Sequence, residues 1–127
     1  MEKIRILLAD DHPQVRTQIC SRLRREPDLA VIGEAADSRQ ALAFARLERP
    51  TLVLIDPFMR DGLGLEAVHR IAACLPEIAI IVLAAVTDTA QRMALRKAGV
   101  RQILDKEFPS EQLVKLLRQM GRCEQPL

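Results

Sequence analysis

Charged side chains follow three apolar runs of the sequence close to the point where each run ends. Asp10 and Asp11 follow the first run, Asp56 follows the second, and Lys106 follows the third. Clustered carboxylate oxygens are ligands that a small hard cation such as Mg²⁺ prefers, and a lysine beside them can hold a phosphate oxygen. These residue types therefore predict an acidic site that binds Mg²⁺ and phosphate.

The expected order of strands and helices brings these distant residues together. Apolar runs alternate with helical patterns through the whole sequence, which indicates repeated strand-helix units and an α/β fold with a parallel sheet. Strands are expected at about 4–9, 30–34, 52–55, 78–83 and 101–104, with a helix after each. Ligands bind beyond the carboxyl ends of parallel strands, so the charged residues should share one edge of the sheet.

Helix ends and small residues add finer expectations. Asp11 is expected to cap the first helix and Ser38 the second, because short polar side chains accept hydrogen bonds from the free amides of a helix start. Cys20 and Cys74 fit small positions in the core. Residues from Gly121 onward are expected to form a frayed end or the start of a linker.

Length and composition limit the class of protein. The 127 residues fit one domain. The net charge of +2 is too small to indicate nucleic-acid binding. The three cysteines have neither disulfide-framework nor zinc-site spacing, and His12 and His69 are expected at the surface rather than as ligands. No stretch is long and apolar enough for a membrane span and no leader pattern opens the sequence, so we expect a cytoplasmic protein.

Several of these residues belong to a pattern that resembles a known family. The pattern comprises Leu7 to His12, Asp56, Met59, Gly64, the run Ile80 to Leu83, and Lys106. It is similar to the receiver domain of two-component response regulators over essentially the whole chain. The Asp-Asp-His-Pro opening is most similar to the NarL/FixJ-like branch, whose members usually carry a DNA-binding domain after the receiver.

The resemblance implies both a fold and a domain boundary. The fold would be flavodoxin-like, a (βα)5 doubly wound parallel sheet with strand order 2-1-3-4-5 inside a three-layer sandwich. The receiver domain would span 1–121, and 122–127 would be a tail or the start of a linker. The chain could then be the regulatory part of a transcription factor or a single-domain protein, and the sequence is compatible with both.

The resemblance also implies a role for each charged residue. Asp56 would be the phosphoacceptor, taking a phosphoryl group from a sensor histidine kinase or a phosphotransfer protein. Asp11, Asp56 and the backbone carbonyl of Phe58 would hold Mg²⁺. Asp10 would act on the metal mainly through water, and Lys106 would bind the phosphoryl group. Related domains often form homodimers, and we expect neither membrane nor direct nucleic-acid binding, nor small-molecule turnover, by this chain.

The sequence departs from the family pattern at two positions that take part in switching. Ala84 stands where a serine or threonine is usual, and Ile103 stands where an aromatic residue is common. Thr87 is too far along the chain to replace the missing hydroxyl. Arg60 stands in place of a common proline and is expected to reach solvent. Our hypothesis is that phosphorylation survives while the conformational response to it is weakened.

Three other functions compete with a switching receiver. A pseudo-receiver would keep the acids but signal through protein contacts that need no phosphate. A haloacid-dehalogenase-type phosphatase also places a nucleophilic aspartate after a strand, but Phe58 and Arg60 occupy the places of its second acid and its hydroxyl residue. A flavin-binding protein is the weakest alternative, because the loop after the first strand lacks a phosphate cradle and the chain has no Trp or Tyr.

Overall fold

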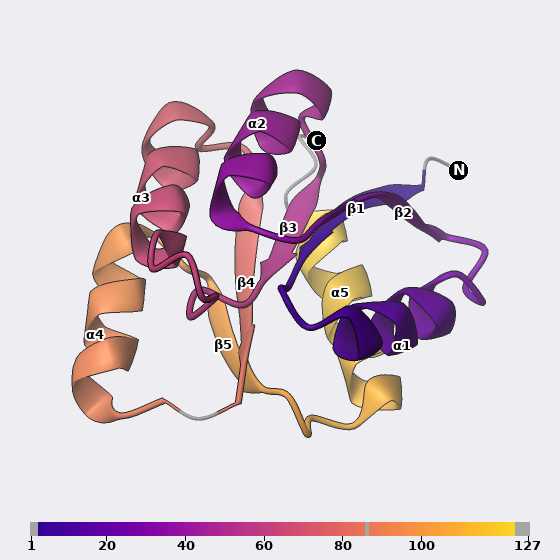
Figure 1. The fold of residues 1–127 in the computed structure, drawn as a ribbon. Helices are drawn as coiled ribbons and strands as arrows, with labels where there is room; N and C mark the ends of the chain where they lie inside the picture. The colour runs from indigo at the N-terminus through magenta and orange to yellow at the C-terminus, as the bar shows by residue number, and fades with distance from the viewer. Residues whose placement is uncertain (1–2, 86, 124–127) are drawn as a thin grey trace.

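Five parallel strands form one sheet in the order β2-β1-β3-β4-β5 (Figure 1). The computed structural model describes residues 3–85 and 87–123. The strands are β1 (Ile4–Ala9), β2 (Leu29–Ala35), β3 (Leu52–Ile55), β4 (Ala79–Ala84) and β5 (Gln102–Asp105). The helices are α1 (Pro13–Leu23), α2 (Ser38–Glu48), α3 (Gly64–Cys74), α4 (Thr89–Ala98) and α5 (Ser110–Cys123). The flavodoxin-like fold and the strand order expected from the sequence are confirmed.

Helices cover both faces of the sheet, which makes three layers. Helices α1 and α5 pack on one face, while α2, α3 and α4 pack on the other (Figure 1). Alternate strand residues serve the two cores: Val53 and Ile55 join the core under α2, α3 and α4, whereas Leu52 and Leu54 join the core under α1 and α5. A strand buried on both faces has apolar residues at every position, which is why β3 is a continuous apolar run.

Two of the expected helix caps are wrong. His12 occupies the cap position of α1 without a side-chain hydrogen bond, and Asp11 instead accepts a hydrogen bond from the backbone of Arg60. Asp37 caps α2 by accepting from the Gln40 amide, so that Ser38 is the first residue inside the helix. At both helix starts, a neighbour of the expected residue lies at the cap position instead. The polar side chain of the expected residue makes a long-range hydrogen bond.

Two expectations about buried and frayed residues are also wrong. Cys20 is buried but Cys74 is exposed. The buried residues around Cys74 are Ile71 and Leu75, so Cys74 lies outside the apolar face of α3. Helix α5 continues through Gly121 to Cys123. Gly121 is buried against β1, where an added Cβ would come within 2.7 Å of Ile4 Cδ1. The rest of the expected tail, 124–127, lies outside the described residues, and the boundary at 121 stays a prediction.

The helices are short relative to the thickness of a bilayer. The longest, α5, has 14 residues, whereas a spanning helix needs about 20 apolar residues. Within residues 3–85 and 87–123, no helix combines the length and the apolar character needed to cross a membrane.

Candidate functional site

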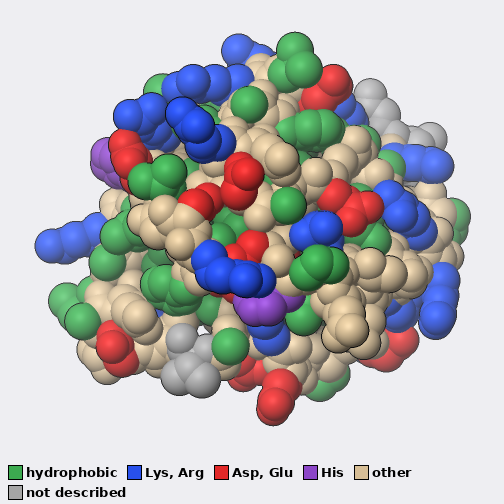
Figure 2. Space-filling model, viewed as in Figure 1, with side chains coloured by type: hydrophobic (Ala, Val, Ile, Leu, Met, Phe, Trp, Pro, Cys, Tyr) green, Lys and Arg blue, Asp and Glu red, His purple; other side chains and the backbone are tan. Residues whose placement is uncertain are grey.

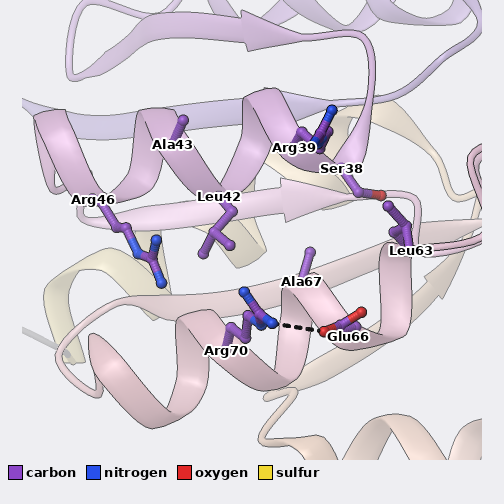
Figure 3. Close-up of a pocket in the computed structure, with 9 residues that line it drawn as sticks. All are labelled: Ser38, Arg39, Leu42, Ala43, Arg46, Leu63, Glu66, Ala67 and Arg70. Carbon is purple, nitrogen blue, oxygen red and sulfur yellow. Dashed lines mark ion pairs between the residues drawn. The ribbon is translucent and has the colours of Figure 1, made fainter.

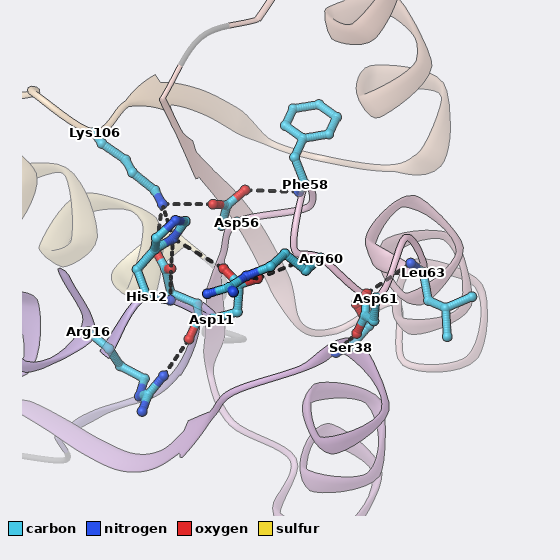
Figure 4. A network of polar contacts seen from close by, with 11 residues as sticks. Asp11, His12, Arg16, Ser38, Asp56, Phe58, Arg60, Asp61, Leu63 and Lys106 are labelled. Atoms are coloured by element: carbon cyan, nitrogen blue, oxygen red, sulfur yellow. Dashed lines mark hydrogen bonds and ion pairs between the residues drawn. The ribbon is translucent and has the colours of Figure 1, made fainter. Parts of the chain in front are cut away.

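The carboxyl ends of β1, β3 and β5 bring two acids and a lysine into direct contact (Figure 4). Lys106 Nζ lies 2.7 Å from Asp56 Oδ2 and 3.0 Å from Asp10 Oδ2. Backbone hydrogen bonds extend the sheet to these residues: the Asp56 amide donates to the Ala9 carbonyl, and the Lys106 amide donates to the Ala84 carbonyl, both at 2.9 Å. The strand ends therefore position three of the four charged residues singled out in the sequence.

Burial makes these contacts electrostatically strong. The side chains of Asp10 and Asp56 are only 2% and 5% exposed, and that of Lys106 is 14% exposed. Burial alone would lower the pKa of Lys106, but the hydrogen bonds to Asp56 and Asp10 outweigh it and raise the pKa above the ordinary lysine value. Lys106 is therefore an ammonium at neutral pH and neutralises part of the acidic charge.

Asp11 is the third acid of the cluster, and one of its oxygens lacks a hydrogen-bond donor. Its Oδ2 accepts from the Arg60 amide at 2.8 Å. Its Oδ1 is buried without a hydrogen-bond partner among the described residues, and His12 Nδ1 lies 3.1 Å away as an ion-pair contact. Burial would raise the pKa of Asp11, but the Arg60 amide and the nearby His12 and Arg60 charges lower it overall. Asp11 is thus a charged carboxylate with one oxygen available to a ligand.

His12 belongs to the cluster, a contact that the sequence reasoning missed. Its Nδ1 lies 3.0 Å from Asp10 Oδ1, and its backbone amide donates to the same oxygen at 2.8 Å. Lys106 Nζ lies 3.3 Å from Nδ1 of the same ring. The His12 side chain is nevertheless 54% exposed. The only signal in the sequence was that His12 directly follows two acids at the end of a strand.

The loop after β3 holds the Asp56 carboxylate in place. The Phe58 amide donates to Asp56 Oδ1 at 2.9 Å, so the missing amide of Pro57 is not needed for this contact. The Arg60 side chain is 82% exposed, as expected, although its Nε lies 3.5 Å from Asp11 Oδ2. Gly64 allows the start of α3 to lie close to the backbone of Pro57, because a Cβ there would lie 1.8 Å from the Pro57 carbonyl oxygen. The loop therefore points Asp56 at the cluster through backbone contacts.

Asp61 links the same loop to the start of α2, a contact that no pattern in the sequence indicated. Its Oδ2 accepts from the Ser38 amide at 2.6 Å. Its Oδ1 accepts from Ser38 Oγ and from the Leu63 amide, both at 2.9 Å. Burial would raise the pKa of Asp61, but the hydrogen bonds from Leu63 and Ser38 lower it overall. Asp61 thus stabilises the loop in its charged form.

Replacing Asp61 with alanine should lower the free energy of unfolding by about 1–3 kcal/mol, because the buried Ser38 donors lose their acceptor. Urea denaturation at neutral pH measures this loss. The lowered pKa means that the stabilisation is present above the ordinary aspartate value of 3.8 and is lost as the pH falls through the folded-state pKa. The difference from wild type should therefore shrink in acid. Glu107→Ala, at an exposed acid, is the control, and an equal loss there would contradict the assignment.

The two expected switch positions carry apolar side chains, one at the end of β4 and one within β5. Ala84 is the last residue of β4 and is buried. Ile103 in β5 pairs with Val82 and packs partly buried against the core under α2, α3 and α4. The Thr87 hydroxyl accepts a hydrogen bond from Arg92 Nε at 2.8 Å. Neither switch side chain can donate a hydrogen bond to a group bound at Asp56.

A separate hollow lies between α2 and α3 (Figure 3), and the acids and lysine of the cluster do not line it. It encloses about 350 Å³ and is lined by Ser38, Arg39, Leu42, Ala43, Arg46, Leu63, Glu66, Ala67 and Arg70. Glu66 pairs with Arg70 at 2.9 Å across one turn of α3. No residue singled out in the sequence for chemistry lines it. In Figure 2, by contrast, acidic, basic and histidine side chains meet near the middle of the face that is drawn.

The acidic cluster as a whole suits a hard divalent cation. Asp10, Asp11, His12 and Asp56 each offer a ligand atom, and these atoms lie within 4.8 Å of one another. The three carboxylates outnumber the Lys106 ammonium, so a divalent ion would complete the charge balance. The fold and the position of the site place the chain among the doubly wound α/β proteins, which bind their ligands beyond the carboxyl ends of the strands.

The family of the chain follows from its match to known proteins. Residues 6–118 match the response regulator receiver domain, and the chain belongs to this family. The curated relative VraR, a response regulator protein of Staphylococcus aureus, is 32% identical over 121 residues. The match covers 95% of this chain but 58% of VraR, so the chain spans a little over half the length of that relative.

Solved structures support the same fold and branch. A LuxR-family two-component response regulator from Aurantimonas sp. SI85-9A1 is 27% identical with a TM-score of 0.88, covering 96% of this chain and 87% of that one. The signal receiver domain of the response regulator NarL from Mycobacterium tuberculosis has the same fold, with a TM-score of 0.89 at 24% identity over 96% of this chain and 98% of that one. The resemblance to the NarL/FixJ-like branch is confirmed.

Proposed function

We propose that the chain accepts a phosphoryl group on Asp56 from the phosphohistidine of a sensor histidine kinase or phosphotransfer protein. The observation that carries this proposal is the 2.7 Å contact between Asp56 Oδ2 and Lys106 Nζ inside a cluster of acids. An Asp56 oxygen attacks phosphorus, a P–O bond forms, the P–N bond breaks, and the histidine ring leaves with its electron pair. The product is an acyl phosphate on Asp56, with no small-molecule turnover.

The donor set of the cluster fits Mg²⁺. Asp11 Oδ1 is buried without a hydrogen-bond donor among the described residues, which is where a cation would supply the missing partner. Asp11, Asp56 and the Phe58 carbonyl would hold the ion, with Asp10 acting through water. When bound, Mg²⁺ supplies neutralisation of the phosphoryl charge, which is the main requirement of phosphoryl transfer.

The other residues of the site hold and orient the reacting groups. The Phe58 amide fixes one oxygen of Asp56. Lys106 can exchange its carboxylate contacts for a phosphoryl oxygen, because its ammonium already lies 2.7 Å from Oδ2 of the attacking Asp56 carboxylate. A fixed carboxylate and a ready positive charge reduce the reorganisation needed when negative charge develops.

The apolar switch positions should weaken the response to phosphorylation. A hydroxyl at the position of Ala84 would donate a hydrogen bond to the phosphoryl group, and such a bond to a charged acceptor is worth about 1.5–3 kcal/mol. Ile103 packs against the core and cannot stack or hydrogen-bond as an aromatic ring does. We therefore propose that the site accepts a phosphoryl group more readily than it transmits a conformational change.

The wider context follows from the family and the relatives. Because VraR and the Aurantimonas protein are response regulators, we propose a receiver at 1–121 that regulates transcription from the cytoplasm, with 122–127 as its tail or the start of a linker. We propose that the chain can form a homodimer and does not itself bind nucleic acid. Membership of the receiver family supports this function over the phosphatase and flavin alternatives.

Beryllofluoride with Mg²⁺, which mimics a phosphoryl group, tests both parts of the proposal. Backbone amide chemical shifts should change around Asp56 and Lys106 and change little in α4 and β5. Asp56→Asn, which removes the acceptor oxygen, is the control and should show no response. Changes that spread through α4 and β5 would contradict weakened switching, and no change at Asp56 would contradict the phosphoacceptor proposal.

A pseudo-receiver is the second candidate, and the apolar side chains of Ala84 and Ile103 favour it. Such a module would bind its partner equally well with and without beryllofluoride. The same titration distinguishes the two functions, because a pseudo-receiver predicts no specific response around Asp56 and Lys106.

A further inference from the structure

We propose that the His12 ring is a nitrogen ligand of the metal site and makes it discriminate between divalent ions. The site would bind a transition-metal ion with affinity for imidazole through the His12 ring. It would bind Mg²⁺ without using His12 as a ligand. This inference rests on the proposed function, because it assumes that Asp11 and Asp56 form a metal site.

The distances around His12 match the edges of a coordination shell. In an octahedral site with ligands at about 2.1 Å, neighbouring ligand atoms lie about 3.0 Å apart and opposite ones about 4.2 Å apart. His12 Nδ1 lies 3.1 Å from Asp11 Oδ1, the length of such an edge, whereas its 3.0 Å contact with Asp10 Oδ1 is a hydrogen bond to the acid that would act through water. The whole set, with Asp56, falls within 4.8 Å, so small side-chain rotations would complete the shell.

The backbone holds the ring in this position. His12 precedes Pro13 at the start of α1, and its own amide donates to Asp10 Oδ1. The Arg16 guanidinium donates to the Asp10 carbonyl at 2.6 Å, which anchors the same turn. The ring therefore lies beside the acids because its turn is hydrogen-bonded, and a ligand would not have to pay the cost of ordering it.

The hydrogen-bonding capacity of the ring leaves the acids only partly satisfied. Nδ1 can donate one proton at most, so it cannot serve both Asp10 and Asp11. Asp11 Oδ1 has no hydrogen-bond partner among the described residues, and a metal bound to this oxygen and to Nδ1 would supply one, replacing any proton on Nδ1 and its hydrogen bond to Asp10 Oδ1. Lys106 Nζ lies 3.3 Å from His12 Nδ1 and 2.7 Å from Asp56 Oδ2, so a metal bound to Nδ1 would require the ammonium to keep its shorter contact with Asp56 and give up the one with the ring.

The choice of ion follows from ligand chemistry. Mg²⁺ prefers oxygen ligands and retains its water, whereas Ni²⁺, Cu²⁺ and Zn²⁺ accept imidazole nitrogen readily. Loss of the ring should therefore weaken the binding of a transition-metal ion and leave Mg²⁺ binding almost unchanged.

Isothermal titration of the full chain with Ni²⁺ and, separately, Mg²⁺ tests this prediction. We expect His12→Ala to weaken Ni²⁺ binding about tenfold or more and Mg²⁺ binding less than about twofold. His69→Ala, which removes the other histidine on the exposed side of α3, is the matched control and should change neither. In Cu²⁺-loaded protein, electron spin-echo spectra should show coupling to an imidazole ¹⁴N nucleus that disappears in His12→Ala.

Several results would overturn the inference. They are an equal loss for both ions, no loss of Ni²⁺ affinity, and nitrogen coupling that persists without His12. Thermal unfolding of His12→Ala checks the fold, and His12→Gln, which keeps a polar side chain, should show the same loss of Ni²⁺ binding. Asp11→Asn separates the two proposals: unchanged Mg²⁺ binding there would overturn the metal site itself, whereas lost Mg²⁺ binding with no effect of His12 would overturn only the role of His12.

Discussion

Phosphoryl incorporation from acetyl phosphate and Mg²⁺ should fall to the background level when Asp56 is replaced by asparagine. The amide keeps the size of the side chain, but it removes the charged oxygen that attacks phosphorus. Intact-protein mass spectrometry measures the added phosphoryl group directly. Asp56 is buried, with Lys106 Nζ 2.7 Å from its Oδ2 and the Phe58 amide donating to its Oδ1, and these contacts hold the carboxylate in place.

Asp105→Asn is the matched control for this experiment. Asp105 is exposed at the end of β5, and its Oδ1 accepts from the Glu107 amide, a contact that asparagine can keep. The control should be phosphorylated like wild type, and chelation of Mg²⁺ should stop labelling in both proteins. Labelling that persists in Asp56→Asn would place the acceptor elsewhere, with Asp10 and Asp11 the first positions to test.

Replacing Lys106 with methionine should lower the free energy of unfolding by about 2–4 kcal/mol in Mg²⁺-free buffer, since breaking a buried ion pair leaves its partner charges uncompensated. Asp10 and Asp56 lose the ammonium that lies within 3.0 Å of both. Methionine keeps most of the apolar stem, so the loss reports mainly the charge. Urea denaturation with a chelator measures it, and added Mg²⁺ should recover part of the lost stability.

The pH dependence of this difference has a definite sign. The pKa of Lys106 is raised, so its stabilisation is fully present below the ordinary lysine value of 10.5 and is lost as the pH rises through the folded-state pKa. The gap between wild type and Lys106→Met should therefore close in strong alkali. Lys115→Met, at an exposed position of α5, is the control and should change stability little. A Lys106 variant as stable as this control would mean that the ion pairs contribute nothing.

The sequence by itself determined the fold and the edge of the sheet where the charges meet. Buried parallel strands need apolar residues on both faces, so β1, β3 and β4 are visible as continuous runs. Because the chain direction is the same in every strand, the residues after those runs must share one edge. That reasoning places Asp10, Asp11, Asp56 and Lys106 together, and the distances agree.

Only the tertiary structure decided which neighbours complete the site. The His12 ring contacts Lys106 across 94 positions of sequence, and Asp61 reaches Ser38 across 23. No local period reports such contacts, because they depend on the direction of a side chain at a turn and on which donor comes within about 3 Å of it. The same reason explains Gly121, whose burial depends on how closely α5 approaches Ile4. Strand patterns determine where the chain goes, and the packing of turns and helix ends determines which atoms meet there.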